Sequence, residues 1–422
     1  MTGTRELDAV RDEVAAWLDA HWDPEITVRR WWEVLALSGW GFPTWPTEWC
    51  GRGLGSDALS VVSDEFSARG ALGAPAGLGQ MMGGPVVMQH GDDDQRVRFV
   101  RRLAAGLEGW CQFFSEPGSG SDLAGAQTRA ERDGDEWVVN GQKVWTSGAM
   151  TADRGMLLAR VDMDAPKHKG LGYFIIEVDQ PGIEIRPLKQ MTGNAHFNEV
   201  FFTDARVSHA DLIGRPGDGW AAAVTTLAYE RGGRAGTVGA SNAPGGSRQG
   251  ILDRKAGDVV TSAAVATPRA GNYGPPPGTS PTELLRGLGK QKDAMLRQQA
   301  VRHYTLSRIA ALNQERVRAE AAAGKSPGPA SSTTKLFRSN MVRANRDLGP
   351  QILGPAGMLA GADAPYDGAV TRATLQAPSV SIAGGTDEIQ HNIIGERVLG
   401  LPREPEVDRN TPFRQLKVGT QR

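Results

Sequence analysis

The stretch EWVVNGQKVW, residues 136–145, places an Asn-Gly pair between two short runs of apolar and aromatic residues. Asn-Gly between such runs is the strongest short-range signal for a β-hairpin, because both residues accept the backbone conformation of a tight turn. GYFIIEVD (172–179), IEIRPL (183–188) and NEVFFTDARV (198–207) are further strand candidates without helical periodicity between them. We therefore predict a small antiparallel β-barrel or sandwich over residues 111–215.

Helical patterns flank this strand region on both sides. Apolar residues recur with helical spacing near the start of the chain, at Leu7, Val10, Val14, Trp17 and Leu18. Further helices are expected at residues 57–68, 94–107, 291–323 and 334–353. The sequence thus predicts a mostly α member of the α+β class, whose helices come before and after the strands.

This order divides the chain into three expected domains and a tail. We predict an N-terminal helical domain (1–110), a central β-domain (111–215), a C-terminal helical bundle (216–403) and a tail (404–422). The stretch between Gly232 and Pro281 is too rich in Pro and Gly for a helix. We expect an irregular insertion at about 236–281, either disordered or a surface excursion.

Composition excludes several classes of protein. The 422 residues carry 47 basic and 48 acidic side chains, and no basic stripe indicates a nucleic-acid partner. Cys50 and Cys111 are the only cysteines and the seven histidines lack ligand spacing, so neither a disulfide framework nor a metal site is expected. No apolar run approaches the roughly 20 residues of a transmembrane helix. With no signal-peptide pattern, we expect a cytoplasmic protein.

Two motifs near the strands have the residue types of a binding site. FFSEPGSGSDLAG (113–125) combines glycines, which allow close backbone approach, with the hydroxyls of Ser115, Ser119 and Ser121. This combination suits an aromatic heterocycle with a polar edge, although a surface turn has the same composition. VWTSGA (144–149) offers a flat tryptophan beside hydroxyl groups; the alternative is that Trp145 belongs to the barrel core.

Two motifs lie in the C-terminal part. QILGPAGML (351–359) follows an amphipathic segment, and SIAGGTDEIQ (381–390) places a Gly-Gly-Thr turn before a helix. The free N–H groups at a helix N-terminus bind anions. The alternative is a capped helix with Thr386 or Asp387 as the N-cap.

Together these motifs and the helix–strand–helix order resemble the acyl-CoA dehydrogenase family, over nearly the whole chain. The resemblance implies an N-terminal helical domain, a central β-domain, a four-helix bundle, and FAD as cofactor. The residues that it assigns to FAD are Gln112, Phe113, Phe114, Ser115, Gly120, Ser121, Trp145, Thr146, Ser147, Gln351, Gly354, Thr386 and Glu388. For the family's arginine before the second bundle helix, Arg286 or Lys290 is the nearest counterpart.

The resemblance also implies α,β-dehydrogenation of an acyl-CoA, which needs a carboxylate to remove the α-proton. Many members carry that glutamate where this chain has Gly384. Others supply it from the first bundle helix, immediately before an arginine, and Glu230-Arg231 matches this pattern. We therefore expect Glu230 to be the base; the alternative is a surface glutamate paired with a lysine or arginine. The expected substrate contacts are Ser121, Tyr229, Arg231, Gly384 and Gly385.

The resemblance implies a homotetramer or homodimer that passes electrons to an electron-transfer flavoprotein. Two alternatives remain at this stage. The first is an oxygen-using acyl-CoA oxidase or flavin monooxygenase on the same fold. The second is a catalytically silent partner subunit of a mixed tetramer, which the irregular insertion and the uncertain counterpart of the family's arginine keep open.

Overall fold

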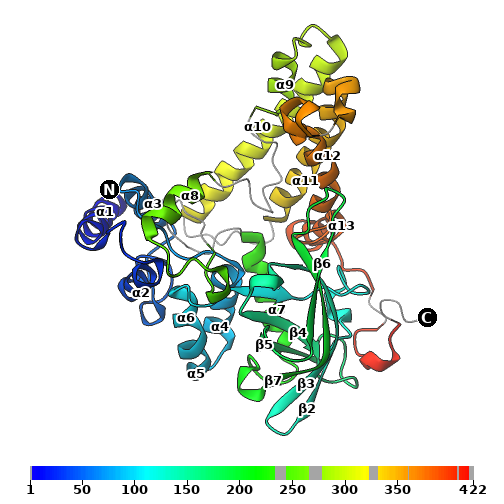
Figure 1. Ribbon diagram of the computed structural model, residues 1–422. Helices are drawn as coiled ribbons and strands as arrows, with labels where there is room; N and C mark the ends of the chain where they lie inside the picture. Colours follow the sequence, from blue (N-terminus) through cyan, green and yellow to red (C-terminus); the bar gives the residue numbers. More distant parts are fainter. Residues whose placement is uncertain are drawn as a thin grey trace. The chain divides into compact units, whose positions relative to one another are not determined.

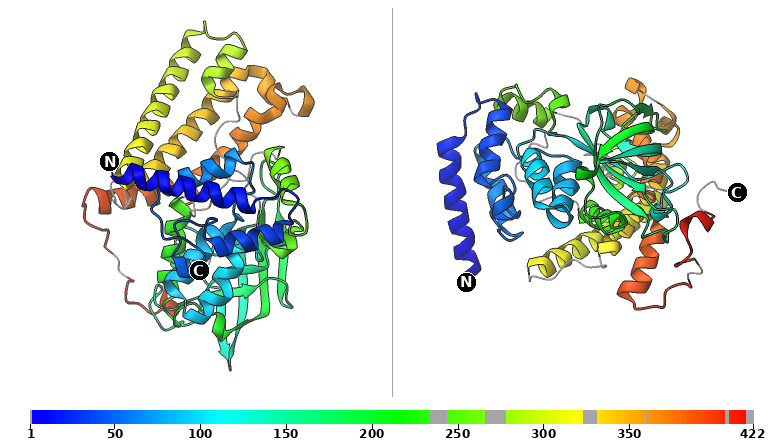
Figure 2. Two further views of the ribbon diagram at one scale, coloured as in Figure 1. Left: turned by 90° about the vertical axis from the view of Figure 1, so that its left-hand side faces the viewer. Right: turned by 90° about the horizontal axis from the view of Figure 1, so that it is seen from below.

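The computed structural model describes residues 2–232, 244–265, 278–322, 331–359, 361–405 and 408–417. The chain forms two compact units (Figures 1 and 2). Unit 1 contains residues 1–188, 195–267 and 406–422, and unit 2 contains residues 189–194 and 268–405. Within the described ranges, no helix has the length and apolar character needed to span a bilayer.

The N-terminal helices of unit 1 surround a core rich in tryptophan. Trp31 and Trp32 of α2 are fully buried, and their indole N–H groups donate to the carbonyls of Leu72 and Gly73 at 2.6 and 2.9 Å. Each indole therefore buries its ring without leaving its polar atom unpaired. The helices are α1 (Thr2–His21), α2 (Val28–Ser38), α3 (Ala58–Ala68), α4 (Gly84–His90), α5 (Asp93–Gln95) and α6 (Arg101–Ala104).

The β-domain of unit 1 is one curled seven-stranded sheet. Its order is β1-β4-β2-β3-β7-β6, with β5 paired to β4. Most pairs are antiparallel, as the sequence predicts, but β4 pairs in parallel with both β1 and β2. The strands are β1 (Trp110–Phe113), β2 (Arg129–Asp133), β3 (Glu136–Ser147), β4 (Arg154–Arg160), β5 (Leu171–Glu177), β6 (Ile183–Leu188) and β7 (Phe197–Ser208).

The hairpin turn predicted at Asn140-Gly141 is wrong. Both residues lie inside the twelve-residue strand β3, and the chain instead turns at Gly134, between β2 and β3. Asn140 exchanges two hydrogen bonds of 2.9 Å with Asp204 of β7. A side chain at Gly141 would meet Thr128 at 2.6 Å, so the glycine permits a close approach and not a turn.

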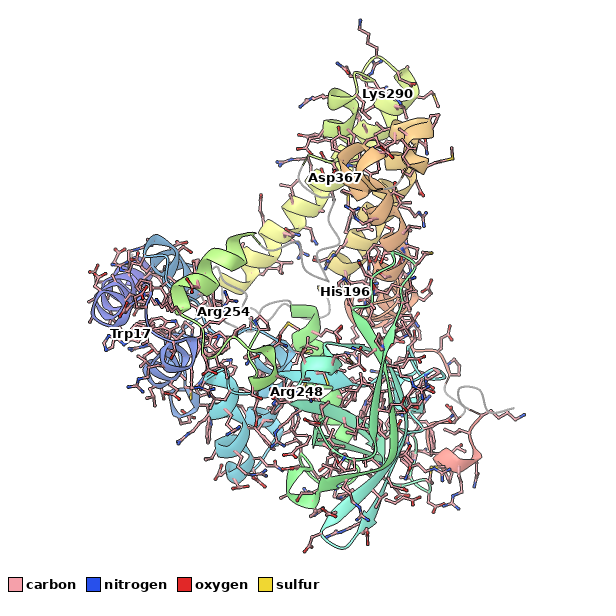
Figure 3. All side chains as sticks on the ribbon, viewed as in Figure 1. Trp17, His196, Arg248, Arg254, Lys290 and Asp367 are labelled. Atoms are coloured by element: carbon pink, nitrogen blue, oxygen red, sulfur yellow. The ribbon has the colours of Figure 1, made fainter. Side chains whose placement is uncertain are left out.

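Part of the predicted irregular insertion is folded. α7 (Gly219–Gly232) is followed, after residues outside the described ranges, by an ordered segment from residue 244 that leads into α8 (Ala256–Val265). Leu252 and Ala256 are buried in the same core as the tryptophans of α2. The expectation of a disordered or excursive stretch is therefore wrong for residues 244–265. Figure 3 labels Arg248 and Arg254 on this segment; residues 233–243 and 266–277 lie outside the description.

Unit 2 is a set of packed helices. Helices α10 and α11 pack against each other, and α11 also packs against α9, α12 and α13. Leu284, Leu285, Ile352 and Leu353 are buried where α9 meets α11. The helices are α9 (Pro281–Gly287), α10 (Ala294–Ala322), α11 (Ser331–Leu353), α12 (Ala369–Val380) and α13 (Asp387–Ile393).

Candidate active site

The loop that follows β1, residues 115–128, contains a turn that is stabilised by its own backbone hydrogen bonds. Glu116 and Ser119 exchange two backbone hydrogen bonds of 2.9 and 3.0 Å across Pro117-Gly118, which makes a tight turn. The Ser119 hydroxyl donates to the carbonyl of Asp122 at 2.6 Å. Gly120 and Ser121 are exposed beyond this turn, and a side chain at Gly120 would meet no atom within 4 Å of its Cβ. The loop therefore presents bare backbone to its surroundings.

A buried ion pair fixes this loop to the sheet. The ammonium of Lys143, fully buried on β3, donates to Glu116 at 2.8 Å and to the carbonyl of Phe114 at 2.9 Å. Glu116 also accepts from the backbone N–H groups of Gln127 and Thr128 at 2.7 and 3.0 Å. Burial raises the pKa of Glu116, but the ammonium and the N–H groups outweigh it, so the pKa lies below its ordinary value. The carboxylate of Glu116 is thus charged, and both of its oxygens accept hydrogen bonds.

Trp145 lies on the same strand, in an unusual backbone conformation. Its φ is +62°, in the left-handed region that bulky residues rarely occupy, where the β3–β7 register shifts between Lys143 and Thr146. Its side chain is 56% exposed and meets Phe197 edge-on, with ring centroids 5.8 Å apart. Residues strained in this way cluster at active sites and ligand-binding sites. The alternative of a core tryptophan is therefore wrong.

Thr146 and Ser147 continue the strand past the bulge. Thr146 is 1% exposed, and its carbonyl accepts from Asn198 at 2.9 Å. Its hydroxyl oxygen is buried and has no hydrogen-bond partner within the described part of the chain. A buried polar atom without a partner is costly, unless a bound group supplies one. Ser147 is half-buried beside it.

The residues at the end of β1 take different positions. Phe113 and Phe114 are buried and pack edge-on against Phe202 and Tyr173, so their side chains belong to the core. Any contact that they make with a ligand has to come from their backbone. Gln112 and Ser115 are half-buried, and the carbonyl of Ser115 accepts from the N–H of Val144 at 2.8 Å.

Helix α7 carries the predicted base on its inner face. Ala222, Ala223 and Thr226 are buried where α7 packs against β5, and the Thr226 hydroxyl lies 3.0 Å from that of Tyr173. Glu230 follows Thr226 by four residues, so it lies on the same face, and it is half-buried. Tyr229 is 40% exposed. The side chain of Arg231 lies outside the described part of the structure.

In unit 2, a glycine-rich turn leads into α13. Gly384 and Gly385 have φ of +66° and +87°, and Gly384 has no atom within 4 Å of the position of a Cβ. Thr386 is the N-cap, accepting from the N–H of Ile389 at 3.2 Å, which confirms one of the two predicted caps. Gln390 donates to the carbonyls of both glycines, at 3.1 and 3.3 Å. Glu388 is exposed.

The remaining predicted residues of unit 2 lie on or beside α9 and α11. Gln351 accepts from Gln299 at 3.2 Å and donates to the carbonyl of Asp347 at 2.8 Å. Gly354 has a φ of +62° directly after α11. Arg286 is exposed on α9, whereas the ammonium of Lys290 donates to the carbonyl of Ile352. Of the two counterparts for the family's arginine, Arg286 is therefore the exposed one.

Comparison with known proteins matches this architecture over most of the chain. Residues 4–107, 111–205 and 288–399 match the N-terminal, middle and C-terminal domains of acyl-CoA dehydrogenase. Acyl-CoA dehydrogenase IpdE1 of Mycobacterium tuberculosis is 37% identical over 376 residues, which cover 89% of this chain and 88% of that protein. The chain belongs to the acyl-CoA dehydrogenase family.

Solved structures agree with this fold. The structure named Tcur3481-Tcur3483 steroid ACAD superposes with a TM-score of 0.66 at 24% identity, covering 95% of this chain and 98% of that chain. The ChsE4-ChsE5 complex from Mycobacterium tuberculosis gives a TM-score of 0.64 at 24% identity, with 94% and 98% covered. Acyl-CoA dehydrogenases are flavin oxidoreductases that depend on FAD.

The residues around the bulge fit such a cofactor. An exposed indole offers a flat face for an aromatic ring system, and the Thr146 hydroxyl is a buried polar group in need of a partner. The bare backbone at Gly120 allows close approach of a ring edge. Within unit 1, these residues of the acyl-CoA dehydrogenase are compatible with an aromatic ring that has a polar edge.

Two buried charges near the predicted site residues, on Lys143 and Asp387, were not predicted from the sequence. Lys143 shares the strand parity of the buried Trp137 and Val139, which was the available signal. A lysine at an inward-facing position requires a buried carboxylate, and Glu116 was the nearest candidate in the quoted loop. Asp387 was considered only as an N-cap, but it is buried and paired with Lys335 and Arg343.

Proposed function

We propose that this protein catalyses α,β-dehydrogenation of an acyl-CoA thioester, with Glu230 as the base that removes the α-proton. The observation that carries the proposal is the position of Glu230, half-buried on the face of α7 that also buries Ala222, Ala223 and Thr226. A surface glutamate would lie on the opposite face of the helix. Gly384 leaves no carboxylate at the position that many relatives use.

The chain's own residues supply the remaining requirements of this reaction. FAD, when bound, supplies the two-electron acceptor for the β-hydrogen. Trp145 and Thr146 hold the flavin ring, and the backbone around Gly120 and Ser121 holds its polar edge. Glu230 keeps the abstracted proton on its carboxylate, and because it is half-buried, water competes less for that proton.

The acyl group is proposed to be large. Relatives that place the base on the first bundle helix act on branched, long or ring-bearing acyl groups, and one structural neighbour is named a steroid ACAD. A panel of straight-chain, branched and steroid-derived acyl-CoA thioesters, mixed with the yellow protein without oxygen, tests this directly. Bleaching of the flavin by a bulky thioester supports the proposal, whereas bleaching only by short straight chains contradicts it.

The electron acceptor is proposed to be an electron-transfer flavoprotein. Admitting air to the substrate-reduced protein separates a dehydrogenase from an oxygen-using oxidase. Slow recovery of the yellow colour supports the dehydrogenase, and recovery within the time of one turnover supports the oxidase.

The protein is proposed to act as an oligomer. Unit 2 exposes large apolar side chains, among them Met358 (86%), Leu399 (67%) and Ile382 (66%), which a second chain would cover in an oligomer. One structural neighbour is named the ChsE4-ChsE5 complex, and another carries the double name Tcur3481-Tcur3483. The second candidate function is therefore a silent subunit of a mixed assembly. Purified alone, such a subunit lacks flavin or never bleaches with any thioester.

A further inference from the structure

The C-terminal segment 408–417 returns to the β-domain within unit 1. It lies along the loop 162–167, where Phe413 and Arg414 donate backbone N–H groups to the carbonyls of Ala165 and Met163, both at 3.0 Å. Phe413 is 2% exposed and forms a small apolar cluster with Leu416 and Met163. The segment is thus anchored by its backbone and by a buried aromatic ring.

The ring of Phe413 covers a buried arginine. The guanidinium carbon of Arg160, at the end of β4, lies 3.7 Å from the ring centroid, and Arg160 is 1% exposed. A desolvated guanidinium over an aromatic face is a strong form of the cation–π contact. Phe413 therefore closes the outer side of a cation that has no access to water.

On the side away from Phe413, Arg160 binds the end of loop 115–128, the loop that follows β1. Its guanidinium donates to the carbonyls of Ala124 at 2.6 Å and Ala126 at 3.3 Å, and to that of Lys167 at 2.6 Å. Its backbone N–H donates to the carbonyl of Thr128 at 2.7 Å. The side chain and the backbone of Arg160 thus hold residues 124–128, which begin three residues after Ser121.

A second contact links the same parts. The ammonium of Lys167 lies 3.3 Å from a carboxylate oxygen of Asp122 in the loop and 4.0 Å from one of Asp408 in the segment. These exposed ion pairs are weak individually. Together they connect the segment to the loop through Lys167, as Phe413 and Arg160 do.

We propose that segment 408–417 is a positioning strap, which sets the conformation of loop 115–128 by holding Arg160 in place. Phe413 is a positioning residue, because it acts on the loop through Arg160. The consequence for FAD rests on the proposed function, in which this loop holds the polar edge of the flavin.

The test compares three variants by hydrogen exchange and by FAD titration of the apo-protein. Phe413→Ala removes the ring over Arg160, and Phe413→Tyr restores an aromatic face as the conservative rescue. Arg414→Ala is the matched control. Arg414 lies on the same segment as Phe413, and its removal breaks only an exposed ion pair with Asp164 of the loop 162–167. Exchange of α3 (58–68) reports whether unit 1 is still folded.

In Phe413→Ala we expect the amides of residues 125–128 to exchange about 5- to 30-fold faster, the factor that loss of a desolvated cation–π contact implies. FAD affinity should fall by a similar factor, while α3 keeps its protection. Phe413→Tyr and Arg414→Ala should resemble the wild type in both measurements.

Unchanged exchange at 125–128, while the segment itself exchanges faster, would overturn the proposal. Faster exchange at 125–128 with unchanged FAD affinity would support the strap, and would count instead against the loop's assigned role in the proposed function. A second result would also overturn the proposal. In it, Phe413→Ala loses protection throughout unit 1, without a selective effect on residues 125–128 at any temperature, and Phe413→Tyr recovers fully.

Discussion

Trp145 combines a strained backbone with an exposed side chain, with a φ of +62° and an indole that is 56% exposed. The bulge between Lys143 and Thr146 reverses the alternation of β3, so that a tryptophan with inward parity becomes exposed. Its positive φ costs free energy that a glycine at the same position would not pay. Substitutions at position 145 can therefore measure the backbone strain separately from the loss of the indole.

We predict that the free energy of unfolding of Trp145→Gly exceeds that of Trp145→Ala by about 1 kcal/mol, because only glycine accepts the left-handed backbone without strain. Both variants should retain FAD poorly, because both lack the indole. Urea unfolding of the apo-proteins and the flavin content after gel filtration are the measurements. If both variants keep their flavin, Trp145 has no role in holding it.

At the scale of elements, the loop after β1 and the strand β3 are joined by Glu116 and Lys143. Breaking a buried pair by removing one partner leaves the other charge desolvated and unpaired. We predict that Lys143→Met lowers the free energy of unfolding by about 3–5 kcal/mol, and that adding Glu116→Gln recovers part of the loss. Chemical denaturation of the single and double variants is the check; equal stability of the two would show that the charges are not coupled.

The same pair gives a pH dependence. Because the pKa of Glu116 is lowered in the folded protein, its stabilising effect is present above the ordinary pKa of a glutamate and is lost as the pH falls through the folded value. The double variant Lys143→Met/Glu116→Gln has no carboxylate at position 116, so its stability should not show this decrease at low pH.

Most elements followed from local patterns, and the exceptions have physical causes. The strands 172–179, 183–188 and 198–207 were predicted to within about two residues at either end, because their alternation and apolar runs are local signals. The turn predicted at Asn140-Gly141 was wrong, because Asp204 and Thr128, which are distant in sequence, make those two residues favourable within a strand. Helix α8 was missed because its flanking Pro and Gly residues dominated the composition of the stretch.

At the scale of the whole molecule, the order of helices, strands and helices was predictable, and the long-range partners were not. Lys335 and Arg343 of α11 reach Asp387 at the start of α13, 44 to 52 residues away in sequence. No local pattern encodes that contact. The family's motifs predict a set of site residues, but they did not predict the buried charges of Lys143 and Asp387.

Asp387 gives a prediction for the acid stability of unit 2. Burial raises its pKa, but hydrogen bonds from Ser339, Arg343 and Lys335 outweigh burial and place the pKa at about 2. The contribution of Asp387 to stability is therefore complete above about pH 4 and is lost as the pH falls towards 2. Asp387→Asn should unfold more easily than the wild type at pH 7, by about 1–3 kcal/mol, and this difference should shrink below pH 4.

Urea midpoints from the helical circular dichroism signal, taken between pH 7 and 3, measure this difference. Asp347→Asn is the control, because Asp347 makes an exposed ion pair with Arg346. A difference between Asp387→Asn and the wild type that stays constant down to pH 3 would contradict the assigned ion pairs.

The most direct test of the enzyme's mechanism is the rate at which an accepted acyl-CoA bleaches the flavin of Glu230→Gln in the absence of oxygen. With equal flavin content and thioester binding, we predict a rate about 10²- to 10⁴-fold below the wild type, because the amide cannot take up the α-proton. Asp253→Asn, which alters an exposed carboxylate paired with Arg29, should react at the wild-type rate. A Glu230→Gln protein that bleaches as fast as the wild type would contradict the assignment of the base.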